Sequence, residues 1–162
     1  MRHALGVVFL LFVTFSSRAA DPVYLDQLME TPLGTLQAQF PGLKREGCYA
    51  LADGHFLLIS IDRKDGKPWR IALTNEAPCR KPESSPATEI ALRKGVILGD
   101  STVKVVEKMG RPDAAAAPEP SLKKLGDLEY FYVCRESEGC ARHTSIFMRG
   151  GVVTAVAEWY SQ

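Results

Sequence analysis

The sequence predicts an α+β protein in which two tandem repeats, each a helix followed by antiparallel strands, form one curved sheet with the helices on one face. Two observations lead to this fold class. Residues 31–42 and 97–112 each place apolar side chains at helical spacing before a Gly/Pro stop, and runs rich in β-branched and aromatic residues follow each segment. A stretch rich in Pro, Ser and charged residues, 75–86, separates the two halves.

The N-terminus has the pattern of a secretory signal peptide. A short basic start precedes an apolar run at 4–15, and small residues then lead to Asp21. The run is too short to span a bilayer as a helix. We therefore expect a signal peptide at 1–20, cleaved just before or just after Ala20, and a mature protein that is periplasmic or secreted. The cleavage region has no cysteine, so we expect no lipid anchor or other membrane anchor.

The charge balance excludes one class of partner. The chain has 20 Lys and Arg against 19 Asp and Glu, and removing Arg2 and Arg18 with the signal peptide leaves 18 against 19, a formal charge of −1. No basic stripe is present, so we expect no nucleic-acid partner. The remaining chain divides into a first repeat with its linker, 21–86, and a second repeat, 87–162.

In the first repeat, the helix within 31–42 should bury Leu36 and Phe40. Strands are expected at 48–52, 55–62 and 69–74, with a three-residue loop that places Gly66 in the left-handed region. This loop puts one set of side chains on the covered face: Leu57, Ile59, Ile61, Trp69, Ile71 and Leu73. The other set lies on the opposite face: Phe56, Leu58, Ser60, Asp62, Arg70 and Ala72.

In the second repeat, Asp100 or Ser101 should cap a helix whose buried face is formed by Val103, Val106 and Met109. Prolines that flank residues 113–120 indicate a loop there. Strands are expected at 128–134, 141–149 and 152–160.

The Gly150-Gly151 turn fixes a register for the last hairpin. It pairs Phe147 with Thr154 and His143 with Glu158. The covered face would then carry Leu128, Tyr130, Tyr132, Ile146, Met148, Val153, Ala155, Ala157 and Trp159. The open face would carry Phe131, Val133, His143, Ser145, Phe147, Arg149, Thr154, Val156, Glu158 and Tyr160.

The four cysteines of an exported chain indicate two disulfides, with three connectivities. We favour Cys48–Cys79 and Cys134–Cys140, which keep each pair within one half. The competing interpretation is a metal site that combines these thiols with His55 and His143. The sequence has no Cys-x-x-Cys spacing, so we expect no metal and no cofactor.

The second half carries a pattern of short motifs. Gly-Val-Ile-Leu-Gly-Asp-Ser (95–101), Val-Val-Glu-Lys-Met-Gly-Arg-Pro (105–112) and Met-Arg-Gly-Gly-Val-Val (148–153) together resemble the BamE (SmpA/OmlA) envelope proteins. The tandem arrangement is similar to β-lactamase inhibitory proteins, in which two helix–strand repeats form one sheet and each carries a disulfide. The resemblance implies this fold and the binding of other proteins. The chain departs from BamE in its duplication and in having no cysteine for a lipid.

The open face is the predicted binding surface. Aromatic side chains with Arg and few lysines are typical of protein interfaces. The expected contact residues are Phe131, His143, Phe147, Glu158, Tyr160, Phe56 and Arg70. The alternative is an ordinary solvated sheet face. We expect a non-catalytic module that binds another extracytoplasmic protein or peptide as an inhibitor, assembly factor or accessory subunit; a homodimer through the same face is a further alternative.

Three other interpretations stay open at this point. Gly99-Asp100-Ser101 matches a hydrolase nucleophile motif, although the Asp-x-x-His pair that accompanies it is missing and a helix cap explains the same residues. A small apolar ligand carried in the sheet's concavity is the second. The third is a pH-sensitive His143–Glu158 pair, with a weak solvated salt bridge as its alternative.

Overall fold

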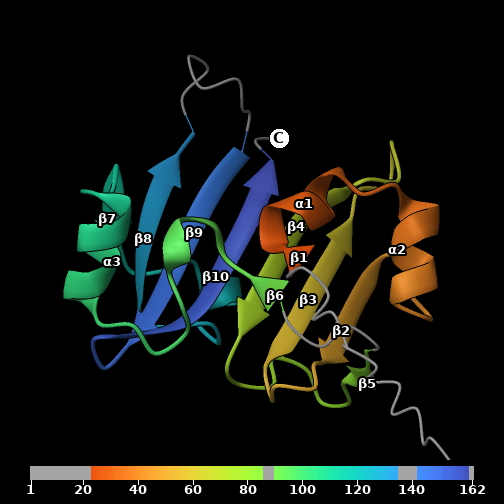
Figure 1. The fold of residues 1–162 in the computed structure, drawn as a ribbon, viewed down its shortest axis with the longest axis horizontal. Helices are drawn as coiled ribbons and strands as arrows, with labels where there is room; N and C mark the ends of the chain where they lie inside the picture. Colours follow the sequence, from red (N-terminus) through yellow and green to blue (C-terminus); the bar gives the residue numbers. More distant parts are fainter. Residues whose placement is uncertain (1–22, 86–89, 135–141, 161–162) are drawn as a thin grey trace, which may run out of the picture.

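The computed structural model describes residues 23–85, 90–134 and 142–160 (Figure 1). The predicted signal peptide therefore lies outside the described residues. The elements are, in order, β1 (Val23–Tyr24), α1 (Leu25–Glu30), α2 (Leu33–Gln39), β2 (Glu46–Ala50), β3 (Phe56–Ile61), β4 (Pro68–Thr74), β5 (Glu83–Ser84), β6 (Ile90–Ala91), the 3₁₀ turn η1 (Arg93–Gly95), α3 (Thr102–Met109), β7 (Ala114–Ala116), the 3₁₀ turn η2 (Pro120–Leu122), β8 (Leu128–Val133), β9 (Arg142–Arg149) and β10 (Val152–Tyr160).

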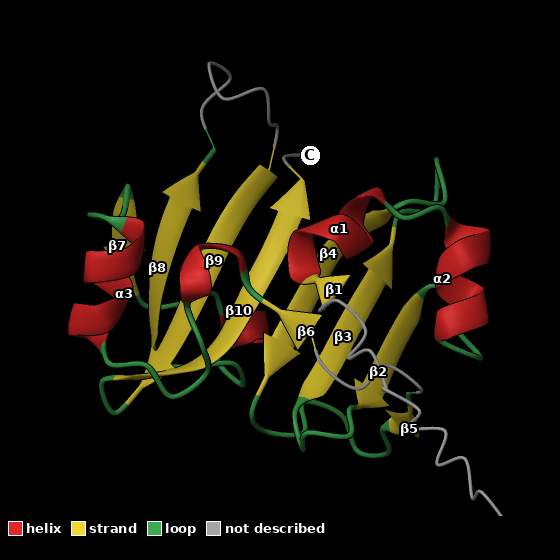
Figure 2. Cartoon of the chain, in the orientation of Figure 1, coloured by secondary structure: helices red, strands yellow, loops and turns green. Residues whose placement is uncertain are grey.

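Eight strands form one mixed sheet in the order β5-β2-β3-β4-β10-β9-β8-β7. Only the β2–β5 pair in this sheet is parallel. Two antiparallel meanders, β2–β3–β4 and β8–β9–β10, therefore meet where β4 pairs with β10 (Figure 2). A separate parallel pair, β1–β6, joins the start of the described chain to residues 90–91. The α+β class is confirmed, and the tandem repeat stays a prediction.

The six long strands overlap those predicted from the sequence, with β2 two residues earlier than expected. The predicted loop at 113–120 contains the short strand β7. The hairpin loop between β3 and β4 also differs from its prediction. Gly66 has the expected left-handed conformation, φ 67°. The backbone of Asp62 pairs with that of Lys67, so the loop is one residue longer than predicted. A bulge at Trp69 then restores the predicted pairing from Ser60–Arg70 onward. Trp69 is consequently half-buried and does not belong to the buried core predicted for it.

The main core lies between the helices and one side of the sheet, which we call the helix face (Figure 2). It includes Leu57, Ile59, Ile61, Ile71, Leu73, Ile146, Met148 and Val156 from the sheet, with Leu25, Leu28, Leu36, Phe40 and Val105 from the helices. The prediction for Leu36 and Phe40 is confirmed. The opposite side, which carries Phe147, Ala155 and Trp159, is called the reverse face.

The buried stripe of α3 differs from the prediction. Val105 is fully buried and Met109 half-buried, whereas Val103 and Val106 are exposed at 64% and 39%. α3 lies at the β7–β8 end of the sheet (Figure 1), where a short helix covers the sheet with one narrow stripe of positions four residues apart. The valine spacing alone does not reveal which stripe that is.

A disulfide joins Cys48 of β2 to Cys79, with 6.5 Å between their Cα atoms. This pairing confirms one of the two favoured bonds. It ties the outer part of the first meander to the segment that leaves β4. Cys134 is also disulfide-bonded, but Cys140, the partner predicted for it, lies outside the described residues.

Candidate functional site

A β-bulge at Thr154 decides which side chains of β10 lie on which face. β9 and β10 pair at Arg149–Val152 as the two-glycine turn predicts, but the register shifts by one residue between Val153 and Ala155. Because side chains alternate along a strand, one extra residue moves every later side chain to the opposite face. The faces predicted for β10 beyond the bulge are therefore wrong.

The bulged residue is held by contacts from two neighbouring segments. The Thr154 hydroxyl donates a hydrogen bond to the carbonyl of Leu125, and the Thr154 carbonyl accepts one from the amide of Asn75. Thr154 is buried. These contacts come from residues far away in sequence, so the hairpin's own turn gives no sign of the bulge.

The main consequence of the bulge is that Trp159 lies on the reverse face. It is opposite His143 on β9 and Arg70 on β4. Its indole Nε1 donates to the hydroxyl of Ser145 over 3.0 Å, and that hydroxyl donates to a carboxylate oxygen of Glu129 over 2.6 Å. The chain of hydrogen bonds fixes the indole plane while leaving the side chain half-buried.

The guanidinium of Arg70 lies close to the rings of both Trp69 and Trp159. Its guanidinium carbon is 4.8 Å from the ring centre of Trp69 and 5.9 Å from that of Trp159. Both distances are within the range of cation–π attraction. Burial lowers the pKa of Arg70 from its ordinary value, and the charge of Glu46 opposes part of that shift. The group therefore presents a partly desolvated cation flanked by the chain's two tryptophans.

Phe131 and His143 form a second aromatic pair beside Trp159. Their rings are stacked, with centres 5.1 Å apart and planes inclined by 29°. They border a hollow of about 420 Å³. The lining residues are Ala114, Ala116, Glu119, Leu122, Glu129, Phe131, His143, Trp159 and Tyr160. The hollow and the Trp69–Arg70–Trp159 group lie side by side, because Trp159 belongs to both.

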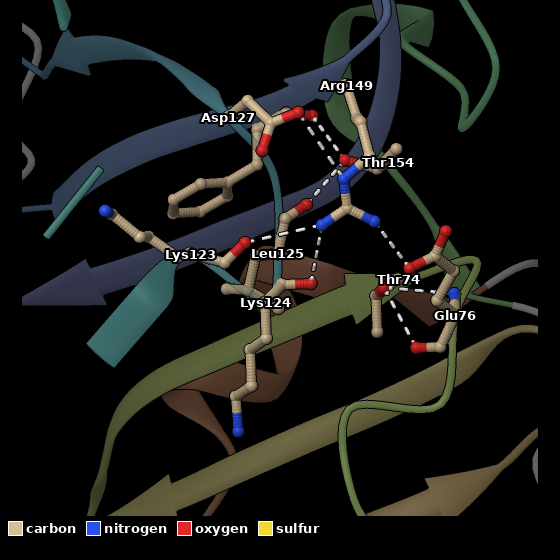
Figure 3. A network of polar contacts seen from close by, with 9 residues as sticks. Thr74, Glu76, Lys123, Lys124, Leu125, Asp127, Arg149 and Thr154 are labelled. Atoms are coloured by element: carbon tan, nitrogen blue, oxygen red, sulfur yellow. Dashed lines mark hydrogen bonds and ion pairs between the residues drawn. The ribbon is translucent and has the colours of Figure 1, made fainter. Parts of the chain in front are cut away.

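Residues 119–127 cover the middle of the reverse face, where Leu122 and Leu125 pack against Phe147. Figure 3 shows the part of this segment from Lys123 to Asp127. Arg149 holds this segment: its guanidinium donates to the carbonyls of Lys123 and Lys124, both over 3.3 Å, and to Glu76 over 2.7 Å. Phe147 is 0% exposed and packs with Leu122 and Leu125. The prediction that Phe147 contacts a partner is therefore wrong.

The bulge places Glu158 on the helix face, away from the predicted binding surface, whereas Tyr160 at the end of β10 contacts α1 and also lines the rim of the reverse-face hollow. Glu158 lies opposite Thr144, whose hydroxyl donates to it over 2.8 Å. The Tyr160 hydroxyl donates to Glu30 of α1 over 2.6 Å. Burial, followed by this bond and the charge of Glu30, raises the pKa of Tyr160 to about 12. The predicted His143–Glu158 pair is wrong for the same reason.

Phe56 is on the reverse face as predicted but belongs to another part of it. It lies opposite Thr74, whereas Arg70 is four residues further along β4. That separation is about 13 Å along a strand. Of the residues expected to contact a partner, Phe131, His143 and Tyr160 line one hollow, and Arg70 lies next to it through Trp159. Sequence analysis missed Trp69 and Trp159, and the one signal for them was that they are the chain's two tryptophans.

Ser101 caps α3. Its hydroxyl accepts a hydrogen bond from the amide of Lys104 over 3.4 Å. Asp100 accepts bonds from Lys108 over 2.6 Å and from the amide of Ile97 over 2.9 Å. Burial acts to raise the pKa of Asp100, but these two donors and the lysine charges hold it below its ordinary value. Both side chains thus take part in the local structure of the helix start.

No group of three or more His, Cys, Asp or Glu in the described part of the chain is arranged to hold a metal ion. None of the helices in those same ranges is both long enough and apolar enough to cross a membrane.

Comparison with protein-family models, with curated proteins and with solved structures gives no match for this chain. The resemblance to BamE-like envelope proteins and to β-lactamase inhibitory proteins therefore stays a prediction. The functional argument depends on the geometry of the reverse face.

Proposed function

We propose that this chain is a non-catalytic extracytoplasmic module that binds another protein through the reverse face of its sheet. The contact surface consists of Trp69, Arg70, Phe131, His143 and Trp159. The observation that carries the proposal is the Arg70 guanidinium 4.8 and 5.9 Å from the ring centres of Trp69 and Trp159, of which Trp159 lies on the side of the sheet opposite the α-helices.

The composition of this group supports a protein partner. Trp, Tyr and Arg supply most of the binding energy at protein interfaces, because they bury large areas while keeping polar groups that orient the contact. All five side chains are half-buried, so each retains surface for a partner. The neighbouring hollow of about 420 Å³ offers a place for one inserted side chain.

The experiment is affinity capture from the native envelope fraction with purified, immobilised protein, followed by identification of the captured proteins by mass spectrometry. We compare the natural protein with Trp159→Ala and Phe131→Ala. Loss of one interface anchor of this kind costs about 2 kcal/mol or more, which is about a thirtyfold loss of affinity. Ile97→Ala is the matched control, since Ile97 is an apolar residue that is 61% exposed near α3.

Capture of the same proteins at the same level by all three variants would contradict the proposal. A folding defect is recognised separately by circular dichroism and by the melting temperature of each variant. Sedimentation analysis resolves the homodimer alternative: a dimer of the natural protein that Trp159→Ala dissociates would assign the reverse face to self-association.

Export to the periplasm or the cell exterior, with removal of residues 1–20, is part of this proposal. The Cys48–Cys79 disulfide supports it, because such bonds form and persist mainly in oxidising compartments. Expression of the full chain followed by intact-mass measurement of the exported product tests it. A product that retains residues 1–20, or that stays in the cytosol, would contradict this part.

Internal duplication is also proposed. Each half contributes a three-stranded meander, and the last strands of the two meanders, β4 and β10, pair at the centre of the sheet. This arrangement is what two copies of one helix–meander unit produce when they join edge to edge. Superposition of the two halves in an experimental structure tests it, and different helix placements relative to the meanders would contradict it.

A further inference from the structure

A second candidate site lies on the helix face, and it shares no residue with the contact surface proposed on the reverse face. A cavity of about 190 Å³ opens between α1, η1, α3 and the strands β8, β9 and β10. Most of its wall is apolar, including Leu25, Leu92, Val96, Met109, Ile146 and Val156. Apolar cavities of roughly 150 Å³ take up molecules of the size of benzene. The space therefore fits a molecule with one ring.

The carboxyl group of Glu158 lines this space, and only one of its two oxygens accepts a hydrogen bond from the described residues. Glu158 lines the cavity, and its Oε1 accepts the hydroxyl of Thr144 over 2.8 Å. Its Oε2 makes no hydrogen bond with the described residues. This oxygen is not among the described side-chain atoms that are both fully buried and without a partner, so a ligand donor can reach it and form a charge-assisted hydrogen bond.

The nearby cation on the sheet is already engaged elsewhere. The guanidinium of Arg142 donates to the carbonyl of Asp26 over 2.8 Å and lies 3.8 Å from the Asp26 carboxylate and 3.6 Å from that of Glu30. Arg142 thus secures the end of β9 to α1. It leaves Oε2 of Glu158 for another donor.

Lys94 stands at the rim with a backbone conformation that the fold imposes. Its φ is 61°, and among the described residues it is the only one other than glycine with a positive φ. Such conformations are uncommon and concentrate at functional positions. The Lys94 side chain lines the cavity but is exposed, so it can turn to solvent when a ligand enters.

We propose that this cavity binds a small organic amine, with the ring of the ligand in the apolar space and its ammonium group on the free oxygen of Glu158. Glu158 and Asp26 bring two carboxyl groups to the cavity, and Asp26 is occupied by Arg142. An ammonium group would donate a charge-assisted hydrogen bond to the second oxygen of the Glu158 carboxylate, while the apolar wall accommodates the ring.

The protonation of Glu158 makes this binding dependent on pH. Burial raises the pKa of Glu158 to about 7, while the Thr144 hydroxyl, Arg142 and Lys94 act to lower it and Asp26 acts to raise it. The other titratable groups near the carboxyl are Tyr132 on β8, which lines the cavity, and Tyr160 on the same strand. The ionised form of Glu158, which pairs with an ammonium, therefore predominates above neutral pH.

The test is isothermal titration of the purified full chain with benzylamine, with benzyl alcohol as the neutral analogue and benzoate as the anionic one. We expect benzylamine to bind most tightly, and its affinity to fall about thirtyfold between about pH 8 and about pH 5.5, because Glu158 takes up a proton. Glu158→Gln should lose about tenfold or more in affinity at the higher pH and lose this pH dependence. Amide chemical shifts at Thr144, Ile146 and Val156 should move during the titration.

Two further variants sharpen the result. Glu129→Gln removes a half-buried carboxylate from the reverse face and should bind benzylamine as the natural protein does. Lys94→Asn keeps a residue that tolerates positive φ and removes a competing ammonium, so benzylamine should bind a few-fold more tightly. Equal affinity for benzyl alcohol, tighter binding of benzoate, shifts confined to the reverse face, or no binding at all would each overturn the proposal.

Discussion

Glu158 shows how the position of one residue changes its chemistry. On a solvated sheet face its carboxyl would stay ionised at neutral pH and contribute little. The bulge at Thr154 instead turns it towards the helices, where burial raises its pKa to about 7. The carboxyl therefore changes charge near neutral pH, and the stability of the folded chain depends on that charge.

The stability of the natural protein should decrease as pH rises through this range. The ordinary pKa of Glu158 is 4.5 and the folded value is about 7, so the folded state holds the proton more tightly than the unfolded state between those values. The free energy of unfolding therefore falls from pH 4.5 to about 7 and loses up to about 3 kcal/mol by pH 8. Urea denaturation at several pH values measures it.

Glu158→Gln removes the titrating group, so the difference between its stability and that of the natural protein should vary with pH in this window. Glu129→Gln is the control for the loss of a half-buried carboxylate. A natural protein and a Glu158→Gln variant with parallel pH profiles would show that Glu158 is not the group responsible.

At the scale of elements, residues 119–127 act as a cover that is attached to the sheet by few but specific contacts. Gly126 permits the close approach, because a Cβ atom at this position would lie 2.8 Å from the backbone of Met148. The amide of Asp127 donates to the carbonyl of Met148 over 2.8 Å. Arg149, at the end of β9, bonds to the carbonyls of Lys123 and Lys124 in the cover and to Glu76, which follows β4 (Figure 3).

Arg149→Ala should loosen this cover without unfolding the sheet. The change removes the bonds to Glu76 and to the carbonyls of Lys123 and Lys124, and it leaves those carbonyls to water. Because the guanidinium is 36% exposed, we expect a loss of only about 1–2 kcal/mol in the free energy of unfolding.

The accompanying measurement is amide hydrogen exchange. Exchange at Leu125 and Asp127 should become faster in Arg149→Ala, while exchange in β3 and β4 stays close to that of the natural protein. Arg111→Ala provides a matched control, because Arg111 is exposed and makes no hydrogen bond with the described residues. Unchanged exchange at Leu125 would show that the cover is held by Leu122 and Leu125 packing alone.

For the whole molecule, the pairing of β4 with β10 joins the two meanders into one sheet. Five residue pairs connect these strands, from Ala155–Thr74 to Trp159–Arg70. The proposed contact surface depends on this seam, since Trp69 and Arg70 come from one meander and Trp159 from the other. The Cys48–Cys79 bond stabilises the first meander on the side away from the seam.

Replacing both Cys48 and Cys79 by alanine should destabilise the protein by about 3 kcal/mol, since the bond closes a long loop in the unfolded chain. The sequence separation of the two residues is 31. Chemical denaturation of the double variant and of the natural protein, both without reductant, measures the loss. If the two proteins were equally stable, the disulfide would not stabilise the fold by lowering the conformational entropy of the unfolded chain.

Local signals in the sequence determined the α+β class, the six long strands, the cap at Ser101 and the Cys48–Cys79 pairing. Each depends on a short pattern: alternation of side chains, a capping residue before an apolar run, or a cysteine position within one half. Leu36 and Phe40 were assigned to the core for the same reason. Apart from the disulfide, whose cysteines are 31 positions apart, these features follow from interactions between residues that are close in the chain or alternate along one strand.

The tertiary structure decided the composition of the candidate surface. Phe147 is buried because residues 119–127 fold over it, and Trp159 replaces Glu158 on the reverse face because of the bulge at Thr154. Thr154 also contacts the Phe147 carbonyl in its own hairpin, but two of its contacts come from Leu125 and Asn75, 29 and 79 positions away in the numbering. Alternation predicts faces only while the register is unbroken, and distant contacts set where it breaks.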